Sequence, residues 1–211
     1  MGIFDSIINQ AGNTIRSQVG SDARTAVNKA MQGTDKLISK AVSDFRRKKE
    51  SFTFEKIPAS LDALKALPQA DLKNPFGTAA LVILAMNNYN SDFAACLEML
   101  TFLKGPGTMY GHEIQRMADQ LKGKDYHMRS YFEGATPENN YEPSRPYKLT
   151  IFDNPHSYDN KGYAVLWVKT AGADTERQIR LRKKESTGEW FLDEEALTPE
   201  IRKPKEADPW A

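Results

Sequence analysis

Residues 130–147, SYFEGATPENNYEPSRPY, gather the side chains of this sequence that are best suited to binding another molecule. Aromatic rings with polar tips supply large contact areas, and an arginine adds a positive charge. Prolines restrict the backbone, and adjacent asparagines support turn conformations that most residues avoid. The candidate partner-binding residues of this loop are Tyr131, Phe132, Asn139, Asn140, Tyr141, Arg145 and Tyr147.

The same composition also suits a purely structural role. A long connection has little regular hydrogen bonding, so large side chains must attach it to the rest of the fold. The sequence therefore leaves two interpretations of residues 130–147 open. They are a surface that binds a protein partner, or an ordered connector between two strands.

Residues that usually carry catalysis or bind metals are scattered along the chain. His112, His127 and His156 include no pair at ligand spacing on one helix, so we expect no metal site and no cofactor. Cys96 lies in an apolar stretch, where cysteine behaves as a small buried side chain. We expect no catalytic residues. An enzyme of unfamiliar type, with a site near His127 or His156, is kept as an alternative.

The composition is that of an ordinary soluble protein. Of the 211 residues, 40% are hydrophobic and 27% are charged, and the net charge is +1. A near-neutral balance argues against nucleic-acid binding, which needs a basic surface. The single cysteine excludes an intrachain disulfide, and no apolar run reaches the roughly 18 residues of a membrane span. We expect a cytoplasmic protein.

Charge and proline are unevenly distributed. Residues 1–50 hold nine Lys and Arg against five Asp and Glu, whereas all eleven prolines follow residue 50. We therefore expect an amphipathic helical arm with a basic linker over 1–50 and an α+β domain over 51–211.

The arm carries an apolar stripe at helical spacing. Phe4 and Ile15 lie eleven residues apart, as do Ile8 and Val19, and eleven residues in three turns keep these side chains on one face of a helix. Glycines within 3–45 weaken a lone helix, so the stripe needs a surface. A membrane surface and another helix, from this chain or from a second copy, both fit.

Four basic residues end the arm: Arg46, Arg47, Lys48 and Lys49. Beside a membrane-bound helix they would add attraction to anionic lipid. The alternative is a solvated linker in front of the domain.

The domain shows a change of period along its length. Apolar positions three and four apart predict helices over 60–67, 74–89, 91–105 and 108–123. Alternating positions predict strands over 51–58, 124–132, 146–153, 162–170, 176–184 and 189–194. Most helices precede most strands, which indicates an α+β domain with about three to four helices packed on an antiparallel β-meander.

Several segments of the domain are distinctive: TAALVILAM, MLTFLKGPG, GKDYHMRSYFEGATPENNYEPSRPY, GAD with RQIRLRKKESTGEWFL, and the terminal DPWA. Together they resemble an uncharacterised bacterial family, a domain of unknown function. The resemblance covers residues 52–211 and leaves the arm outside. It implies no activity.

These features favour a non-enzymatic binding or scaffold protein. The arm would dock on a membrane surface or an assembly, and the domain would present residues 130–147 to a protein partner. A homo-oligomeric protein that assembles through the arm is an alternative. We expect a protein partner or self-association, with membrane contact through residues 3–45 and without nucleic acid.

Overall fold

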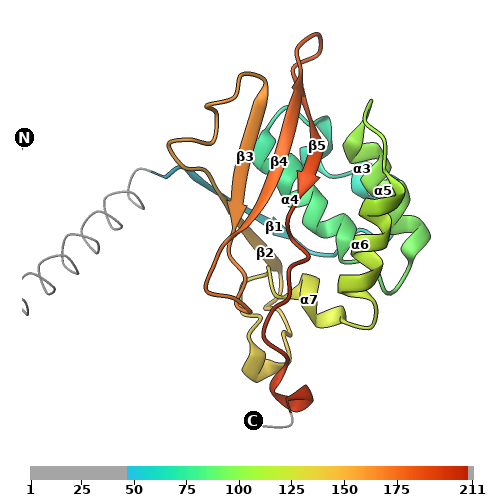
Figure 1. The fold of residues 1–211 in the computed structure, drawn as a ribbon, viewed down its shortest axis with the longest axis vertical. Helices are drawn as coiled ribbons and strands as arrows, with labels where there is room; N and C mark the ends of the chain where they lie inside the picture. The colour runs from blue at the N-terminus through green and yellow to red at the C-terminus, as the bar shows by residue number, and fades with distance from the viewer. Residues whose placement is uncertain (1–46, 209–211) are drawn as a thin grey trace, which may run out of the picture. The chain divides into compact units, whose positions relative to one another are not determined.

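The computed structural model describes residues 47–208, which form the sheet and helices of Figure 1. The chain divides between Arg47 and Lys48 into two units, and the second unit contains the described strands and helices. Residues 1–46 of the predicted arm lie outside the described residues, and with them its docking side chains, one residue of the basic linker and, at the other end of the chain, the terminal tryptophan: Phe4, Ile8, Ile15, Val19, Arg46 and Trp210.

Five antiparallel strands form one sheet, and their order in space follows their order in sequence. The strands are β1 (Lys49–Phe54), β2 (Tyr147–Phe152), β3 (Tyr163–Val168), β4 (Arg177–Lys184) and β5 (Glu189–Glu195). Ser51 of β1 lies opposite Thr150 of β2, and their hydroxyls share a hydrogen bond of 2.8 Å. The sheet therefore opens with a strand that precedes the helices in sequence.

The α-helices of the described part are inserted between β1 and β2. They are α3 (Leu61–Lys65), α4 (Pro75–Met86), α5 (Phe93–Lys104), α6 (Gly111–Leu121) and α7 (Asp125–Arg129). Three short 3-10 turns complete the domain: η1 (Pro68–Asp71), η2 (Pro137–Asn139) and η3 (Lys205–Ala207). The predicted α+β class and antiparallel sheet are confirmed.

Helix α4 forms the centre of the core and contacts every strand of the sheet. Its start agrees with the sequence pattern, because the Asn74 side chain accepts a hydrogen bond from the Phe76 N–H at 3.0 Å and Pro75 occupies the first turn. Every residue from Phe76 to Met86 is buried. The nearly uniform apolar sequence of α4 thus predicts its central position correctly.

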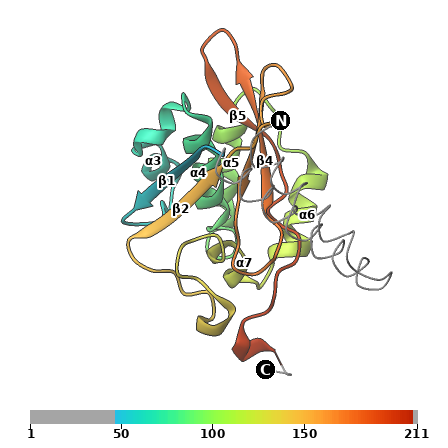
Figure 2. The ribbon, with the colours of Figure 1, turned by 90° about the vertical axis from the view of Figure 1, so that its left-hand side faces the viewer.

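One face of the sheet packs on the helices, which Figures 1 and 2 show gathered on one side of it. The alternation of β4 illustrates the reason: Ile179 and Leu181 are buried, whereas Arg180 and Arg182 are exposed. The other strands contribute the remaining inward side chains, namely Leu149, Ile151, Ala164, Leu166, Val168 and Leu192.

The strand predicted over 124–132 is wrong, because this segment forms helix α7 and a turn. His127 and Met128 are adjacent and both are buried, which an alternating strand does not allow. The described residues therefore contain five α-helices instead of the expected three to four. The loop 130–147 connects a helix to a strand, not two strands.

Candidate functional site

The aromatic side chains of the loop 130–147 point into the fold. Tyr131, Phe132 and Tyr141 are only 4%, 3% and 0% exposed. Tyr147 is half-buried, and its ring centroid lies 5.3 Å from that of Phe132. Tyr131 and Phe132 attach the loop to the main core and Tyr141 packs in a smaller buried cluster with Ile201, so these three rings do not lie on a surface that a partner would meet.

The asparagines of the loop close it internally. The Asn139 amide nitrogen donates to the carbonyl oxygens of Gly134 and Glu142, at 2.8 and 3.0 Å. Asn140 adopts a left-handed conformation with φ of 56°, which asparagine tolerates better than most residues. Arg145 is exposed, with its guanidinium 5.5 Å from the Tyr147 ring centroid. Of the predicted binding residues, Arg145 is the clearest candidate for an outside contact.

The loop and α7 are fastened to the segment after β5. The His127 Nε2–H donates to the Leu197 carbonyl oxygen at 3.1 Å, and the Tyr131 hydroxyl donates to the same oxygen. Burial lowers the pKa of His127 and raises that of Tyr131. Both groups are therefore uncharged at neutral pH and serve as structural hydrogen-bond donors.

The carboxylate of Glu195 also binds the segment around Leu197. Glu195 is 6% exposed, and its carboxylate accepts hydrogen bonds of 2.7 Å from Arg116 and from the Leu197 N–H. Burial raises the pKa of Glu195, while these two hydrogen bonds act in the opposite direction. This cluster of titratable groups is occupied by contacts within the protein.

The other residues considered for chemistry do not join this cluster. His156 is exposed and pairs with Asp159 at 2.8 Å, and Cys96 is fully buried, which raises its thiol pKa to about 12. Within residues 47–208 no group of three or more His, Cys, Asp or Glu could hold a metal ion. The same residues contain no helix that is both long and apolar enough to span a membrane.

One residue of the predicted basic linker, Lys49, belongs to the sheet, and a second, Lys48, is hydrogen-bonded to its edge. Lys49 begins β1, and the Lys48 N–H donates to Asp153 at 2.7 Å. The Lys48 ammonium also pairs with Glu50 at 2.7 Å and lies 4.7 Å from the Phe76 ring centroid. Lys48 is therefore held by the folded unit, although its side chain stays largely exposed.

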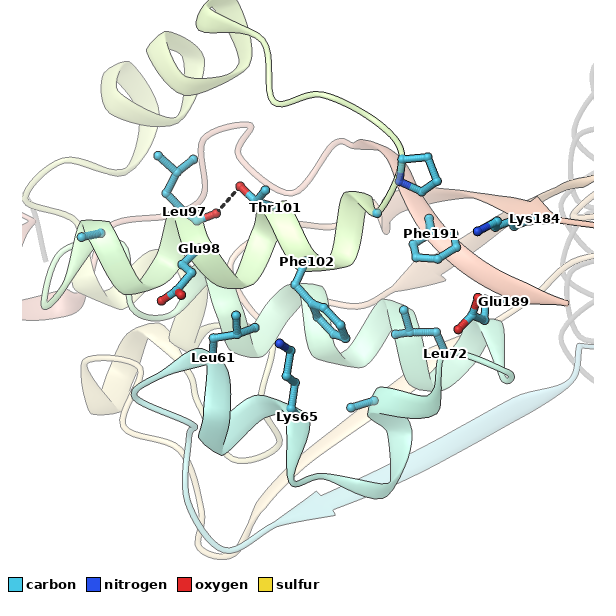
Figure 3. Close-up of a pocket in the computed structure, with 14 residues that line it drawn as sticks. Leu61, Lys65, Leu72, Leu97, Glu98, Thr101, Phe102, Lys184, Glu189 and Phe191 are labelled. Carbon is cyan, nitrogen blue, oxygen red and sulfur yellow. Dashed lines mark hydrogen bonds between the residues drawn. The ribbon is translucent and has the colours of Figure 1, made fainter. Parts of the chain in front are cut away.

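An open groove of about 900 Å³ with a largely apolar lining is bounded by α3, α5 and β5. Figure 3 shows Leu61 of α3 and Phe102 of α5 in the space between these two helices, Leu97 on the other side of α5, and Phe191 of β5 at one end. All four of these side chains remain half-buried. The groove is thus an apolar surface that the described residues leave incompletely covered.

Four charged side chains line the groove: Lys65, Glu98, Lys184 and Glu189. The Lys65 ammonium lies 5.1 Å from the centroid of the Phe102 ring, above its face. Glu98 stands on the exposed side of α5, toward the Leu61 end of the groove. Lys184 and Glu189 are opposite each other on β4 and β5.

The sequence contains a signal for the groove that the prediction did not use. Ala94, Leu97, Thr101 and Gly105 recur along α5 at intervals of three and four residues, on the side opposite the buried Cys96, Met99, Leu100 and Leu103. Helix α5 therefore has apolar residues on two sides, and the core covers only one of these sides. The sequence did not show which elements lie next to the uncovered side of α5.

The fold and the groove define a small α+β domain with one sheet, a helical layer and an open apolar surface. The chain belongs to the family described as Domain of unknown function (DUF6935), whose model matches residues 56–205. No curated protein and no solved structure shows significant similarity to it. The family match confirms the resemblance to a domain of unknown function and assigns no activity.

Proposed function

We propose that this chain is a non-enzymatic binding or scaffold protein, in which the α+β domain presents a protein-interaction surface and the N-terminal arm docks on a membrane surface or an assembly. The observation that carries the proposal is the groove between α3, α5 and β5. Leu61, Leu97, Phe102 and Phe191 line it and remain half-buried. Contiguous apolar surface with a charged rim is typical of sites that bind other proteins.

The groove supports the proposal better than the loop 130–147 does. In the loop, the rings of Tyr131 and Tyr141 are buried and their hydroxyls donate hydrogen bonds to backbone oxygens inside the domain. In the groove, Phe102 and Leu97 keep apolar area that a partner can cover. Removing about 100 Å² of such area from water contributes roughly 2.5 kcal/mol to binding, before the entropic cost of association.

A photo-crosslinking amino acid at Thr101 tests the interaction surface. Thr101 is exposed and lines the groove, so a probe there contacts whatever binds. We expect irradiation of source cells to yield adducts with a protein, identified by mass spectrometry. The matched control is the same probe at Asp159, an exposed residue of the β2–β3 loop that does not line the groove. An absence of protein adducts from Thr101, or equal adducts from Asp159, contradicts the proposed surface.

The arm half of the proposal rests on the sequence stripe of Phe4, Ile8, Ile15 and Val19. Flotation of the full-length chain with neutral and anionic liposomes tests it. We expect flotation on anionic vesicles and its loss in the double variant Phe4→Asp and Ile15→Asp, since charges on an apolar face oppose insertion.

The control for flotation adds the same charge to the opposite helical face, through Ser6→Asp and Ser17→Asp, which lie about 200° from the stripe at 100° per residue. This control should still float. If neither form floats but the apolar-face variant changes the size of the particle in solution, the arm is an assembly helix, as the alternative interpretation holds.

A further inference from the structure

We infer that the free edge of β1 is a second interaction surface, where β1 of another copy of this chain pairs with it, antiparallel across a two-fold axis. This surface is separate from the groove between α3, α5 and β5, because the groove is lined by other elements. The inference goes beyond the proposed function and does not depend on it. Three observations carry it: the direction of the backbone groups of β1, the contrast with the opposite edge of the sheet, and two unpaired charges.

The hydrogen bonds to β2 show which backbone groups of β1 point away from it. The Asp153 N–H donates to the Lys48 carbonyl oxygen at 3.0 Å. This pair lies one step before Lys49 in the register of β1 with β2. In an antiparallel ladder, hydrogen-bonded pairs alternate with pairs that exchange no backbone hydrogen bond. Every second residue of β1 therefore directs its N–H and C=O toward the free edge, namely Lys49, Ser51 and Thr53.

Two further contacts agree with this assignment. Ser51 faces Thr150 of β2, and their hydroxyls share a hydrogen bond of 2.8 Å, as suits a pair without backbone bonds, where the side chains lie closest. Lys148 of β2 faces Thr53, but its carbonyl oxygen accepts from the Glu133 N–H at 2.9 Å. The backbone groups of Ser51 and Thr53 are therefore available at the other side of β1.

The chain covers the opposite edge of the sheet but leaves this one open. At β5, the Trp190 N–H donates to the Leu72 carbonyl oxygen at 2.8 Å, and the Lys104 ammonium donates to the Asp193 carbonyl oxygen at 3.2 Å. At β1, which is the margin of the sheet in Figure 2, no group of residues 47–208 binds the edge-directed backbone. The strand has neither a proline nor a bulge, two devices that prevent edge pairing.

A two-fold axis at Ser51 uses the whole edge. When Ser51 faces Ser51 of the second copy, Lys49 faces Thr53, and all the edge-directed residues form hydrogen-bonded pairs. Each such pair exchanges two backbone hydrogen bonds. A shift of the register by two residues would move one of these pairs beyond the end of β1. The side chains at the centre, Ser51 and Thr53, are small and exposed, so they do not obstruct a neighbouring strand.

The charges at the two ends of β1 complement each other in this register. Lys49 begins the strand, and Glu55 follows its last residue. Both side chains are exposed, and neither makes an ion pair within residues 47–208. Because Lys49 faces Thr53 of the second copy, Glu55 of that copy is its diagonal neighbour, within reach of long side chains. The two-fold axis forms this contact twice, which is why the inference names a second copy.

Ser51→Pro tests the inference, because it removes a donor at the free edge alone. The Ser51 N–H does not donate to β2, and edge strands accept proline where the N–H faces outward. Sedimentation of the full-length wild type should show a dimer. Ser51→Pro should raise its dissociation constant about tenfold or more, since the ring replaces the central donor. The matched control, Ser51→Ala, keeps the N–H and should remain dimeric. Circular dichroism verifies that both variants fold.

Cysteine crosslinking tests the register without proline. Ser51→Cys should oxidise to a covalent dimer, because the Cα atoms of a hydrogen-bonded antiparallel pair lie about 5.5 Å apart, within the range of a disulfide. Thr53→Cys alone should not, because its counterpart faces residue 49, about 13 Å away along the strand. An equimolar mixture of Thr53→Cys and Lys49→Cys should form the crosslink. Cys96 is buried and contributes no background.

Three outcomes would overturn the inference: a monomeric wild type, a dimer indifferent to Ser51→Pro, or equal crosslinking of Ser51→Cys and Thr53→Cys. In the second case the dimer belongs to another surface, such as the arm or the groove. If Ser51→Pro does not fold, the crosslinks decide alone. The proposed function fails separately, through an absence of protein adducts from the probe at Thr101, whatever the oligomeric state.

Discussion

The hydroxyl of Tyr141 donates a hydrogen bond of 2.8 Å to the backbone carbonyl oxygen of Arg202. The ring of Tyr141 is fully buried, stacks on Tyr126 with centroids 5.7 Å apart, and has a pKa that burial raises to about 12. This contact joins the loop after α7 to the segment after β5. The Arg202 N–H in turn donates to the Gly172 carbonyl oxygen at 2.9 Å.

Tyr141→Phe should loosen the segment after β5. The variant keeps the buried ring but removes the donor to Arg202, which should cost about 1 kcal/mol. Native-state hydrogen exchange of the Arg202 amide should accelerate about fivefold. The control is Tyr158→Phe at an exposed tyrosine of the β2–β3 loop, which should leave this amide unchanged. Equal exchange in both variants would show that the hydroxyl does not hold the segment.

Gly172→Ala should destabilise the domain. A Cβ atom at this position would lie 2.6 Å from the Ile201 Cβ and 2.8 Å from the Tyr141 hydroxyl oxygen. Both neighbours are buried, so the added methyl group should lower the free energy of unfolding by about 1–3 kcal/mol. Urea denaturation measures the change.

Gly111→Ala is the matched substitution in open space. No atom lies within 4 Å of a Cβ atom placed there, at the start of α6. Alanine favours the helix more than glycine does, so this variant should be neutral or more stable by up to about 1 kcal/mol. If both alanine variants lose stability equally, the clash at Gly172 is not the cause.

The buried His127 should make stability depend on pH. Burial lowers its folded-state pKa below the ordinary 6.5, and the nearby positive charges of Lys124 and Arg177 act in the same direction. Between the folded pKa and 6.5 the unfolded chain binds more protons than the folded chain does. The free energy of unfolding should therefore decrease as the pH falls below about 6.5.

His127→Gln isolates this contribution, because the glutamine amide can donate to Leu197 but does not titrate. Urea unfolding at several pH values between 7.5 and 5 should show a smaller loss for the variant than for the wild type. Glu195 has a pKa raised by burial and contributes with the opposite sign, but it is present in both proteins. Parallel curves for the two proteins would contradict the assignment.

Arg116→Met should destabilise the domain, because the buried Glu195 carboxylate loses its ion pair. The buried carboxylate would lose a charged hydrogen bond of 2.7 Å, and its pKa should rise further. We expect a loss of about 2 kcal/mol at pH 7, less than for a fully buried pair because the Arg116 side chain is 37% exposed.

The double variant Arg116→Met and Glu195→Gln should recover part of this loss, because the amide carries no charge to neutralise. A double-mutant cycle in urea measures the coupling between the two side chains. Additive losses would show that the ion pair does not couple them.

The elements that depend on local patterns could be predicted from the sequence. Asn74 and Pro75 mark the start of α4, and the alternation of Ile179 and Leu181 with arginines marks β4. Cys96 is buried as its apolar surroundings predict. In each case the neighbours along the chain carry the signal, because caps and periodicity act over a few residues.

The segment 124–132 could not be predicted in the same way. Its alternating residues resemble a strand, but α7 forms there since His127 finds a hydrogen-bond acceptor in Leu197, 70 residues away. The partners that bury Tyr131 and Tyr141 are also remote in sequence. Composition thus identified an aromatic loop. That its tyrosines point into the domain depended on contacts with residues distant in sequence, which a local pattern does not reveal.

The candidate site could likewise be predicted from the sequence only in part. The sequence by itself determined the two-sided apolar character of α5, through the residue types at positions such as Leu97 and Leu100. Only the tertiary structure decided that Leu100 faces the core and that Leu97 faces a groove. The physical reason is that hydrophobicity belongs to a side chain, whereas burial belongs to the distant segments that fold against it, here α3 and β5.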